Sequence, residues 1–154
     1  MKIVIASGNA GKIAEFKAVL GPLGHEIISQ SEFNVPEVEE TGTTFIENAI
    51  IKARHCAQIT KCAVIADDSG ICVEALNGEP GLYSARYAGA NATSAERNAL
   101  LLKNMESIKN RKAFFYCSLV LMQNAQDPTP IIAEGRLSGE ILFAEQGKIG
   151  RAHV

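Results

Sequence analysis

The sequence has 154 residues, and its content of 47% hydrophobic and 21% charged residues is typical of one globular domain with a buried core. The net charge of −2 argues against nucleic acid as a partner, because no excess of basic residues is present to neutralise a phosphate backbone. No apolar stretch is long enough for a transmembrane helix, and the run at Met1–Ala6 is too short for a signal peptide, so we expect no membrane partner.

The cysteines lie in apolar stretches and form no Cys-x-x-Cys pair. This pattern argues against a zinc site and indicates reduced core thiols in a cytoplasmic protein. The residues concerned are Cys56, Cys62, Cys72 and Cys117.

The N-terminal part of the chain alternates short strands and helices. A β-branched run predicts a buried strand over Lys2–Ala6, which ends in a glycine-containing turn. Apolar residues at helical spacing predict a helix over Lys12–Leu20, and a second short strand follows at Glu26–Ser29. The segment Ser31–Gly42 has no periodicity and contains several glutamates, so we expect an acidic loop there.

The clearest helix is predicted from Phe45 to Thr60. Thr44 and Glu47 have the spacing of a capping box, and apolar residues then repeat every three or four positions along one face. Lys52 falls within this helix, where a lysine most commonly lies on the solvated face, and we give it that role.

The rest of the chain is rich in strands. A buried strand at Ala63–Ala66 leads into the polar segment Asp67–Gly70, and Ile71–Ala75 continues as strand. Helices between the early strands, followed by this strand-rich half, predict an α/β fold with a mixed sheet. Further along we predict turns at Asn77-Gly78 and Pro80-Gly81, a helix over Thr93–Met105, and strands over Ala113–Gln123, Ile131–Arg136 and Gly139–Phe143.

The segment Ile149–Val154 has neither strand nor helix character, and it matches the translation of a common sequencing adapter in one reading frame. We therefore expect a single domain over residues 1–147 that is incomplete at its C-terminus, followed by a non-native tail over residues 148–154. A natural frameshift would have the same consequence.

Ser7–Lys12 forms a glycine-containing turn between the first strand and the first helix. Gly8 and Gly11 would let backbone N–H groups approach an anion, the helix would point its positive end at the same place, and Lys12 would add a full charge. The spacing of a Walker A motif is absent. From this segment alone, an ordinary strand-to-helix turn with a surface lysine is the alternative.

Asp67 and Asp68 follow a buried apolar strand, where two adjacent carboxylates are costly unless a cation lies close to them. Mg²⁺ is the natural cation, because it binds one or two carboxylates together with substrate phosphates. Glu40 would add a ligand if its loop folds over this pair. The alternatives are an Asp-rich turn in water and, for Glu40, a partner of the helix dipole.

Arg86 lies among glycines and small residues in the segment Gly81–Gly89. A guanidinium in such a segment can bind phosphate oxygens through two hydrogen bonds. A solvated arginine in a surface loop is the alternative.

Taken together, these segments resemble the Ham1/inosine-triphosphatase family of pyrophosphatases that act on non-standard purine nucleoside triphosphates. The motifs occur in the family's order and span nearly the whole chain up to residue 147; they are Ser7–Lys12, Glu39–Gly42 with Thr44–Ala53, Ile65–Gly70 and Pro80–Gly89. The resemblance implies an α/β fold with a long central mixed sheet, flanking helices and a cleft between two lobes. It also implies a cytoplasmic homodimer that hydrolyses ITP, XTP and dITP to the monophosphate and pyrophosphate.

The resemblance further implies roles for individual residues. Asp68 would be the proton acceptor and would hold Mg²⁺ together with Glu40 and the neighbouring Asp67. The residues that would bind the substrate are Ser7, Gly8, Asn9, Ala10, Gly11, Lys12, Ser69 and Arg86.

The family's later segments, which recognise the purine and close on the phosphates, are not found in the 154 residues. These are a Phe-Gly-Tyr-Asp-Pro segment, a lysine and a Ser-His-Arg segment, and without them we expect the chain as given to be inactive or severely impaired. Two other classes stay open, namely a pyrophosphatase for other modified nucleotides and a non-catalytic nucleotide-binding module.

Overall fold

The computed structural model describes residues 1–145, and the chain divides into two compact units. Unit 1 comprises Met1–Asp68 and Ser118–Ala133, and unit 2 comprises Ser69–Cys117 and the described residues from Glu134 onward. The predicted tail over residues 148–154 lies outside the described residues. The assignment of residues 1–147 to a single domain stays a prediction.

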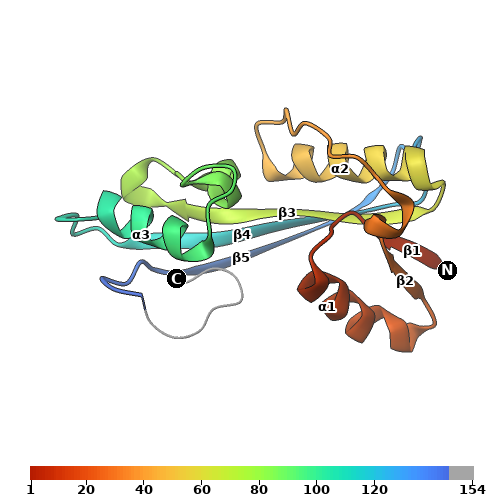
Figure 1. Cartoon of the computed structure of the whole chain (residues 1–154), viewed down its shortest axis with the longest axis horizontal. Helices are drawn as coiled ribbons and strands as arrows, with labels where there is room; N and C mark the ends of the chain where they lie inside the picture. The colour runs from red at the N-terminus through yellow and green to blue at the C-terminus, as the bar shows by residue number, and fades with distance from the viewer. Residues whose placement is uncertain (146–154) are drawn as a thin grey trace. The chain divides into compact units, whose positions relative to one another are not determined.

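A five-stranded sheet has the strand order β2-β1-β3-β4-β5 (Figure 1). β1 pairs in parallel with both β2 and β3, so that Ile3 lies opposite Ile27 on one side and Ala63 on the other. The predicted α/β class, with a long mixed sheet flanked by helices, is confirmed. The strands are β1 (Lys2–Ile5), β2 (Glu26–Ser29), β3 (Ala63–Val73), β4 (Lys112–Met122) and β5 (Ile131–Glu140).

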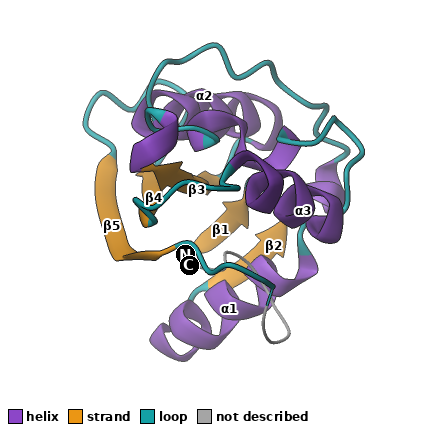
Figure 2. Cartoon of the chain, turned by 90° about the vertical axis from the view of Figure 1, so that its left-hand side faces the viewer, coloured by secondary structure: helices purple, strands orange, loops and turns teal. Residues whose placement is uncertain are grey.

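In unit 1 the helices α1 (Ala10–Leu20) and α2 (Phe45–Thr60) cover opposite faces of the sheet (Figures 1 and 2). The chain passes from β1 to β2 in one direction and from β2 to β3 in the other, and right-handed crossovers then put the two helices on opposite sides. Alternate strand residues fill the two cores. Ile3, Ile5 and Ile65 pack on the side of α1, while Val4, Val64 and Ala66 pack on the side of α2.

The predicted N-terminus of α2 is confirmed. The Thr44 hydroxyl accepts the backbone N–H of Glu47 and donates to the Glu47 carboxylate at 2.8 Å, so the cap and the third helical residue bind each other. Cys56 lies on the buried face of this helix, and burial raises the pKa of its thiol to about 11. Cys56, Cys62 and Cys72 are reduced thiols, and the first and last of these are buried.

Unit 2 has its own apolar core beneath α3 (Ser94–Asn104), which is capped by Thr93. Two short 3-10 helices, η3 (Glu74–Leu76) and η4 (Gly81–Arg86), precede α3 in the chain. The buried Arg111 guanidinium donates to the carbonyls of Met105, Ile108, Ile141 and Leu142, and it thereby ties the segment after β5 to the end of α3.

Two predicted boundaries inside the sheet are wrong. Asp67–Gly70 is not a polar segment between strands but lies within β3, which runs unbroken from Ala63 to Val73. The two strands predicted around Gly139 are one strand, β5, which ends at Glu140. In both places pairing with the neighbouring strands in the sheet order outweighs the local preference of Asp and Gly for turns.

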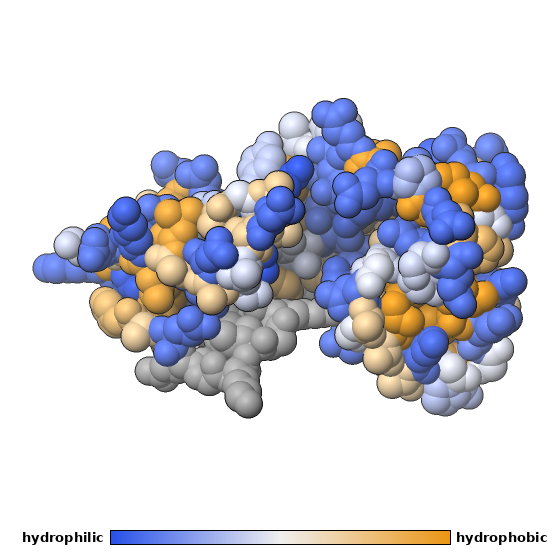
Figure 3. Space-filling view, viewed as in Figure 1, coloured by the Kyte–Doolittle hydropathy of each residue, from blue (hydrophilic) through white to orange (hydrophobic). Residues whose placement is uncertain are grey.

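Other differences are small. α1 begins at Ala10 rather than Lys12 because Asn9 caps it, and a 3-10 helix, η2 (Gln30–Phe33), begins the predicted acidic loop. The predicted turn at Asn77-Gly78 is confirmed, with left-handed backbone at both residues (φ of 55° and 89°), whereas Pro80-Gly81 begins the 3-10 helix η4. Among the described residues, no helix is long and apolar enough to cross a membrane. The face in Figure 3 is largely hydrophilic, with apolar patches between the polar side chains.

Asp127 organises the connection between β4 and β5. Its carboxylate accepts the backbone N–H groups of Gln123 and Thr129, each at 2.9 Å. The hydrogen bond from Gln123, which has the larger effect, and that from Thr129 lower the pKa of the Asp127 carboxyl below its ordinary value.

The lowered pKa of Asp127 has a consequence for stability at acid pH. The ionised Asp127 carboxylate stabilises the folded protein. This stabilisation is complete above the pKa of the unfolded state, about 3.9, and is lost as the pH falls through the lower pKa of the folded state. We therefore expect Asp127→Ala to lower the urea midpoint of unfolding at pH 7, and the difference from the parent protein to shrink as the pH is lowered to 3. A difference of equal size at both pH values would contradict this assignment.

Candidate active site

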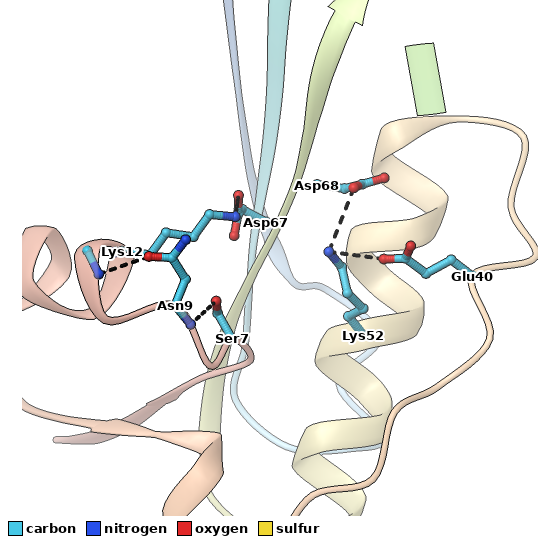
Figure 4. Close-up of polar contacts among 8 residues, drawn as sticks. Ser7, Asn9, Lys12, Glu40, Lys52, Asp67 and Asp68 are labelled. Atoms are coloured by element: carbon cyan, nitrogen blue, oxygen red, sulfur yellow. Dashed lines mark hydrogen bonds and ion pairs between the residues drawn. The ribbon is translucent and has the colours of Figure 1, made fainter. Parts of the chain in front are cut away.

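The turn Ser7–Lys12 connects β1 to α1 and is ordered by its own polar groups (Figure 4). The Asn9 side-chain oxygen accepts the N–H groups of Gly11 at 2.8 Å and Lys12 at 3.2 Å, while the Ser7 hydroxyl accepts the N–H of Asn9 at 3.0 Å. A Cβ atom at Gly8 would meet no protein atom within 4 Å, so this glycine leaves the backbone open to a ligand. Ala10 starts the helix.

Asp67 and Asp68 point to opposite faces of the sheet because consecutive residues of a strand alternate in direction. Asp67 lies on the side of α1, where its Oδ2 is 2.7 Å from the Lys12 ammonium. Asp68 lies on the side of α2, where its Oδ1 is 3.7 Å from the Lys52 ammonium. Each of these buried carboxylates therefore has a lysine from the helix on its own face.

Lys52 also binds Glu40, with its Nζ 3.1 Å from Glu40 Oε1. Figure 4 shows this ammonium reaching from α2 to a place between the carboxylates of Glu40 and Asp68. The solvated role predicted for Lys52 is therefore wrong, since its side chain is only 23% exposed and links two acids from separate segments. The signal available in the sequence was Asn48, which stands one helical turn before Lys52 and is also polar.

The loop that carries Glu40 is fastened to α2 at two points. The buried Asn48 side chain accepts the N–H of Gly42 at 2.8 Å, and the His55 ring lies 2.8 Å from the Pro36 carbonyl oxygen. Gly42 approaches the helix so closely that a Cβ atom there would lie 2.6 Å from the Cβ of Glu47. Asn48 and Gly42 thus position Glu40, a role that the sequence reasoning did not give them.

The structure brings together part of the predicted metal set. Glu40 and Asp68 converge on one cation, the Lys52 ammonium, whereas Asp67 binds Lys12 on the other face. Within residues 1–145, no three His, Cys, Asp or Glu side chains are grouped closely enough to hold a metal ion. Two carboxylates that converge on one positive charge still fit a hard divalent cation that completes its shell with phosphate oxygens and water.

The two remaining predicted residues belong to unit 2. Ser69 follows Asp68 directly in β3, and Arg86 ends the 3-10 helix η4, with its guanidinium 5.8 Å from the centre of the Tyr83 ring. Their part in substrate binding stays a prediction.

Comparison with known proteins identifies the family. The model of the Ham1 family matches residues 3–151. A dITP/XTP pyrophosphatase of Vibrio cholerae is 55% identical over 97% of this chain and 76% of its own length, and one of Shewanella oneidensis is 53% identical over 99% and 75%.

Solved structures agree with this assignment. A HAM1 protein from Coxiella burnetii has a TM-score of 0.91 and 49% identity, and the match covers 97% of this chain and 77% of that one. The Ham1 protein of Staphylococcus aureus has a TM-score of 0.87 and 42% identity, with the same coverage. Because the sequence, the fold and nearly the whole length of the chain agree, the chain belongs to the Ham1 family.

Proposed function

We propose that this protein hydrolyses non-standard purine nucleoside triphosphates, namely ITP, dITP and XTP, to the monophosphate and pyrophosphate. The names of the Vibrio and Shewanella relatives support this substrate class. The observation that carries the proposal is the convergence of Glu40 and Asp68, from two distant segments, on one cation position. Homodimer formation, a cytoplasmic location and the absence of nucleic-acid partners stay predictions.

The position of the acids in the sheet supports a phosphate site. In open α/β sheets, ligands bind beyond the carboxyl ends of parallel strands where the strand order reverses direction. The strand order reverses at β1, because the connection from β1 to β2 and the connection from β2 to β3 run over opposite faces of the sheet. The turn Ser7–Lys12 follows the carboxyl end of β1. The N-terminus of α1 begins in the same turn and favours a negative ligand.

The charges of the site fit a metal-bound triphosphate. Asp67 balances the charge of Lys12, whereas Lys52 faces two carboxylates, so the Glu40–Lys52–Asp68 group has a net charge of −1 and would repel a bare polyanion. Mg²⁺ held by Glu40 and Asp68 would offset this charge and polarise the phosphate oxygens. Whether Asp67 joins them stays part of the proposal.

The chain's own residues would then perform the hydrolysis. The turn Ser7–Lys12 would hold the phosphate chain through backbone N–H groups and the Lys12 ammonium. The Asp68 carboxylate would orient a water molecule and accept its proton as the water oxygen bonds to the α-phosphorus and the bond to the pyrophosphate oxygen breaks. Such catalysis rests on positioning and charge stabilisation. Ser69 and Arg86 would add contacts to the substrate.

The site of attack can be read from an isotope label. We expect the protein encoded by the complete gene to convert ITP in H₂¹⁸O to IMP and pyrophosphate, with the label in IMP because the water attacks the α-phosphorus. Mass spectrometry of both products gives the measurement. Label in pyrophosphate, or release of inorganic phosphate alone, would contradict the proposed reaction.

The same assay separates the alternative functions. Turnover should be much faster for ITP, dITP and XTP than for ATP and GTP. A preference for modified pyrimidine triphosphates would instead indicate a pyrophosphatase for other nucleotides. Binding of ITP without Mg²⁺-dependent pyrophosphate release would indicate a non-catalytic nucleotide-binding module.

Asp68→Asn tests the proposed proton acceptor. We expect turnover of ITP to fall by about a hundredfold or more, the usual size of a general-base contribution, with a much smaller change in KM. Glu37→Gln is the matched control, because it removes one negative charge from an exposed position of the Glu40 loop. Near-parental turnover by Asp68→Asn would remove Asp68 from the mechanism.

Gly42→Ala tests how Glu40 is positioned. The added Cβ would collide with Glu47 and Asn48, so the loop must shift and carry the Glu40 carboxylate with it. We expect kcat for ITP to fall by about tenfold to a hundredfold, as small misplacements of site groups do. Gly21→Ala, where a Cβ has open space and φ is −56°, should keep both activity and melting temperature. Unchanged kcat in Gly42→Ala would show that the loop position is unimportant.

A further inference from the structure

Lys52 occupies the position that a metal ion would need. Its Nζ lies 3.1 Å from Glu40 Oε1 and 3.7 Å from Asp68 Oδ1, so one compact positive charge satisfies both acids (Figure 4). The Asp68 side chain is only 12% exposed, and a carboxylate at that depth needs a nearby cation. The lysine supplies this cation from the protein itself.

We propose that Lys52 is an exchangeable counter-ion, which competes with the divalent metal for Glu40 and Asp68 and moves to the phosphate chain when the metal enters with its nucleotide. This inference rests on the proposed function, because it concerns the same site and describes how the metal and the triphosphate replace the lysine there. The metal then binds tightly only together with a triphosphate.

Electrostatics favours exchange over coexistence. An ammonium and a dication that share the same two carboxylate oxygens would lie a few ångströms apart and repel each other strongly at a partly buried position. The Lys52 charge stands on a flexible four-carbon stem, so it can leave the acids while the α2 backbone stays fixed. A triphosphate, which is strongly anionic, offers the released ammonium a new partner.

The exchange predicts coupled binding. If a bound triphosphate accepts the lysine, it raises the affinity of the site for metal, and the metal must raise the affinity for triphosphate by the same factor. If Lys52 only positions Glu40 and Asp68, a variant without this lysine should bind the metal more weakly. If Lys52 competes with the metal, the same variant should bind it more tightly. The two roles therefore differ in the sign of one measurement.

Lys52→Met gives that measurement, because it keeps the length of the side chain and removes the charge. The probe is Mn²⁺ without nucleotide, and free Mn²⁺ is followed by electron paramagnetic resonance. We expect the variant to bind Mn²⁺ about tenfold more tightly than the parent protein, as fits removal of one unit charge from a partly exposed site. Lys52→Arg should keep the weak binding of the parent, and Lys17→Met, which removes a lysine from the exposed side of α1, should also bind as the parent does.

The second arm repeats the titration with a non-hydrolysable α,β-methylene analogue of ITP. The analogue should tighten Mn²⁺ binding in the parent protein, and this enhancement should be about tenfold smaller in Lys52→Met, since that variant has no lysine to release. Melting curves verify that the variant folds, and Lys52→Gln serves as the neutral variant if Lys52→Met does not.

Mn²⁺ binding by Lys52→Met that is equal to or weaker than that of the parent would overturn the exchange. The titration needs no turnover, so the two proposals fail separately. Failure of the protein encoded by the complete gene to release pyrophosphate from ITP would overturn the proposed function, and a lysine that does not compete with Mn²⁺ would overturn the exchange.

Discussion

The alternation of side chains along β3 determines how the acidic site is built. Asp67 and Asp68 are consecutive residues in the interior of a strand, so their carboxylates cannot share one side of the sheet. Both are buried, and each needs its own compensating charge. Lys12 from α1 supplies it on one face and Lys52 from α2 on the other, and the pair of acids is therefore stable only with both helices in place.

The strand order makes that arrangement available. Because β1 lies between β2 and β3, successive right-handed crossovers place α1 and α2 on opposite faces. The first helix starts at the carboxyl end of β1, so the Ser7–Lys12 turn and the Asp67–Lys12 pair arise from the same corner of the sheet. Residues from separate parts of the sequence thereby form two ion-paired groups within unit 1, namely Lys12–Asp67 on one face of the sheet and Glu40–Lys52–Asp68 on the other.

The parts of the fold with strong local signals could be predicted from the sequence. The periodicity of α2, the Thr44 cap and the β-branched run of β1 do not depend on distant partners. The strand conformation of Asp67–Gly70 does depend on distant partners, because only pairing within the sheet overrides the turn preference of these residues. The acids themselves could be found from their sequence context, but Lys52 could not be assigned to them, since its partners lie twelve and sixteen positions away and only the tertiary fold brings them together.

The rigid and adjustable parts of the site follow from the same architecture. Asp67 and Asp68 are fixed by a strand, and Lys12 and Lys52 extend from helices, so their backbones have little freedom. Glu40 alone among these five charged residues stands on a loop, which is held at Pro36 and Gly42 and passes free of helix or strand between them. If the exchange occurs, we expect the Lys52 side chain and the Glu40 loop to accommodate it, while the sheet keeps Asp68 in one place.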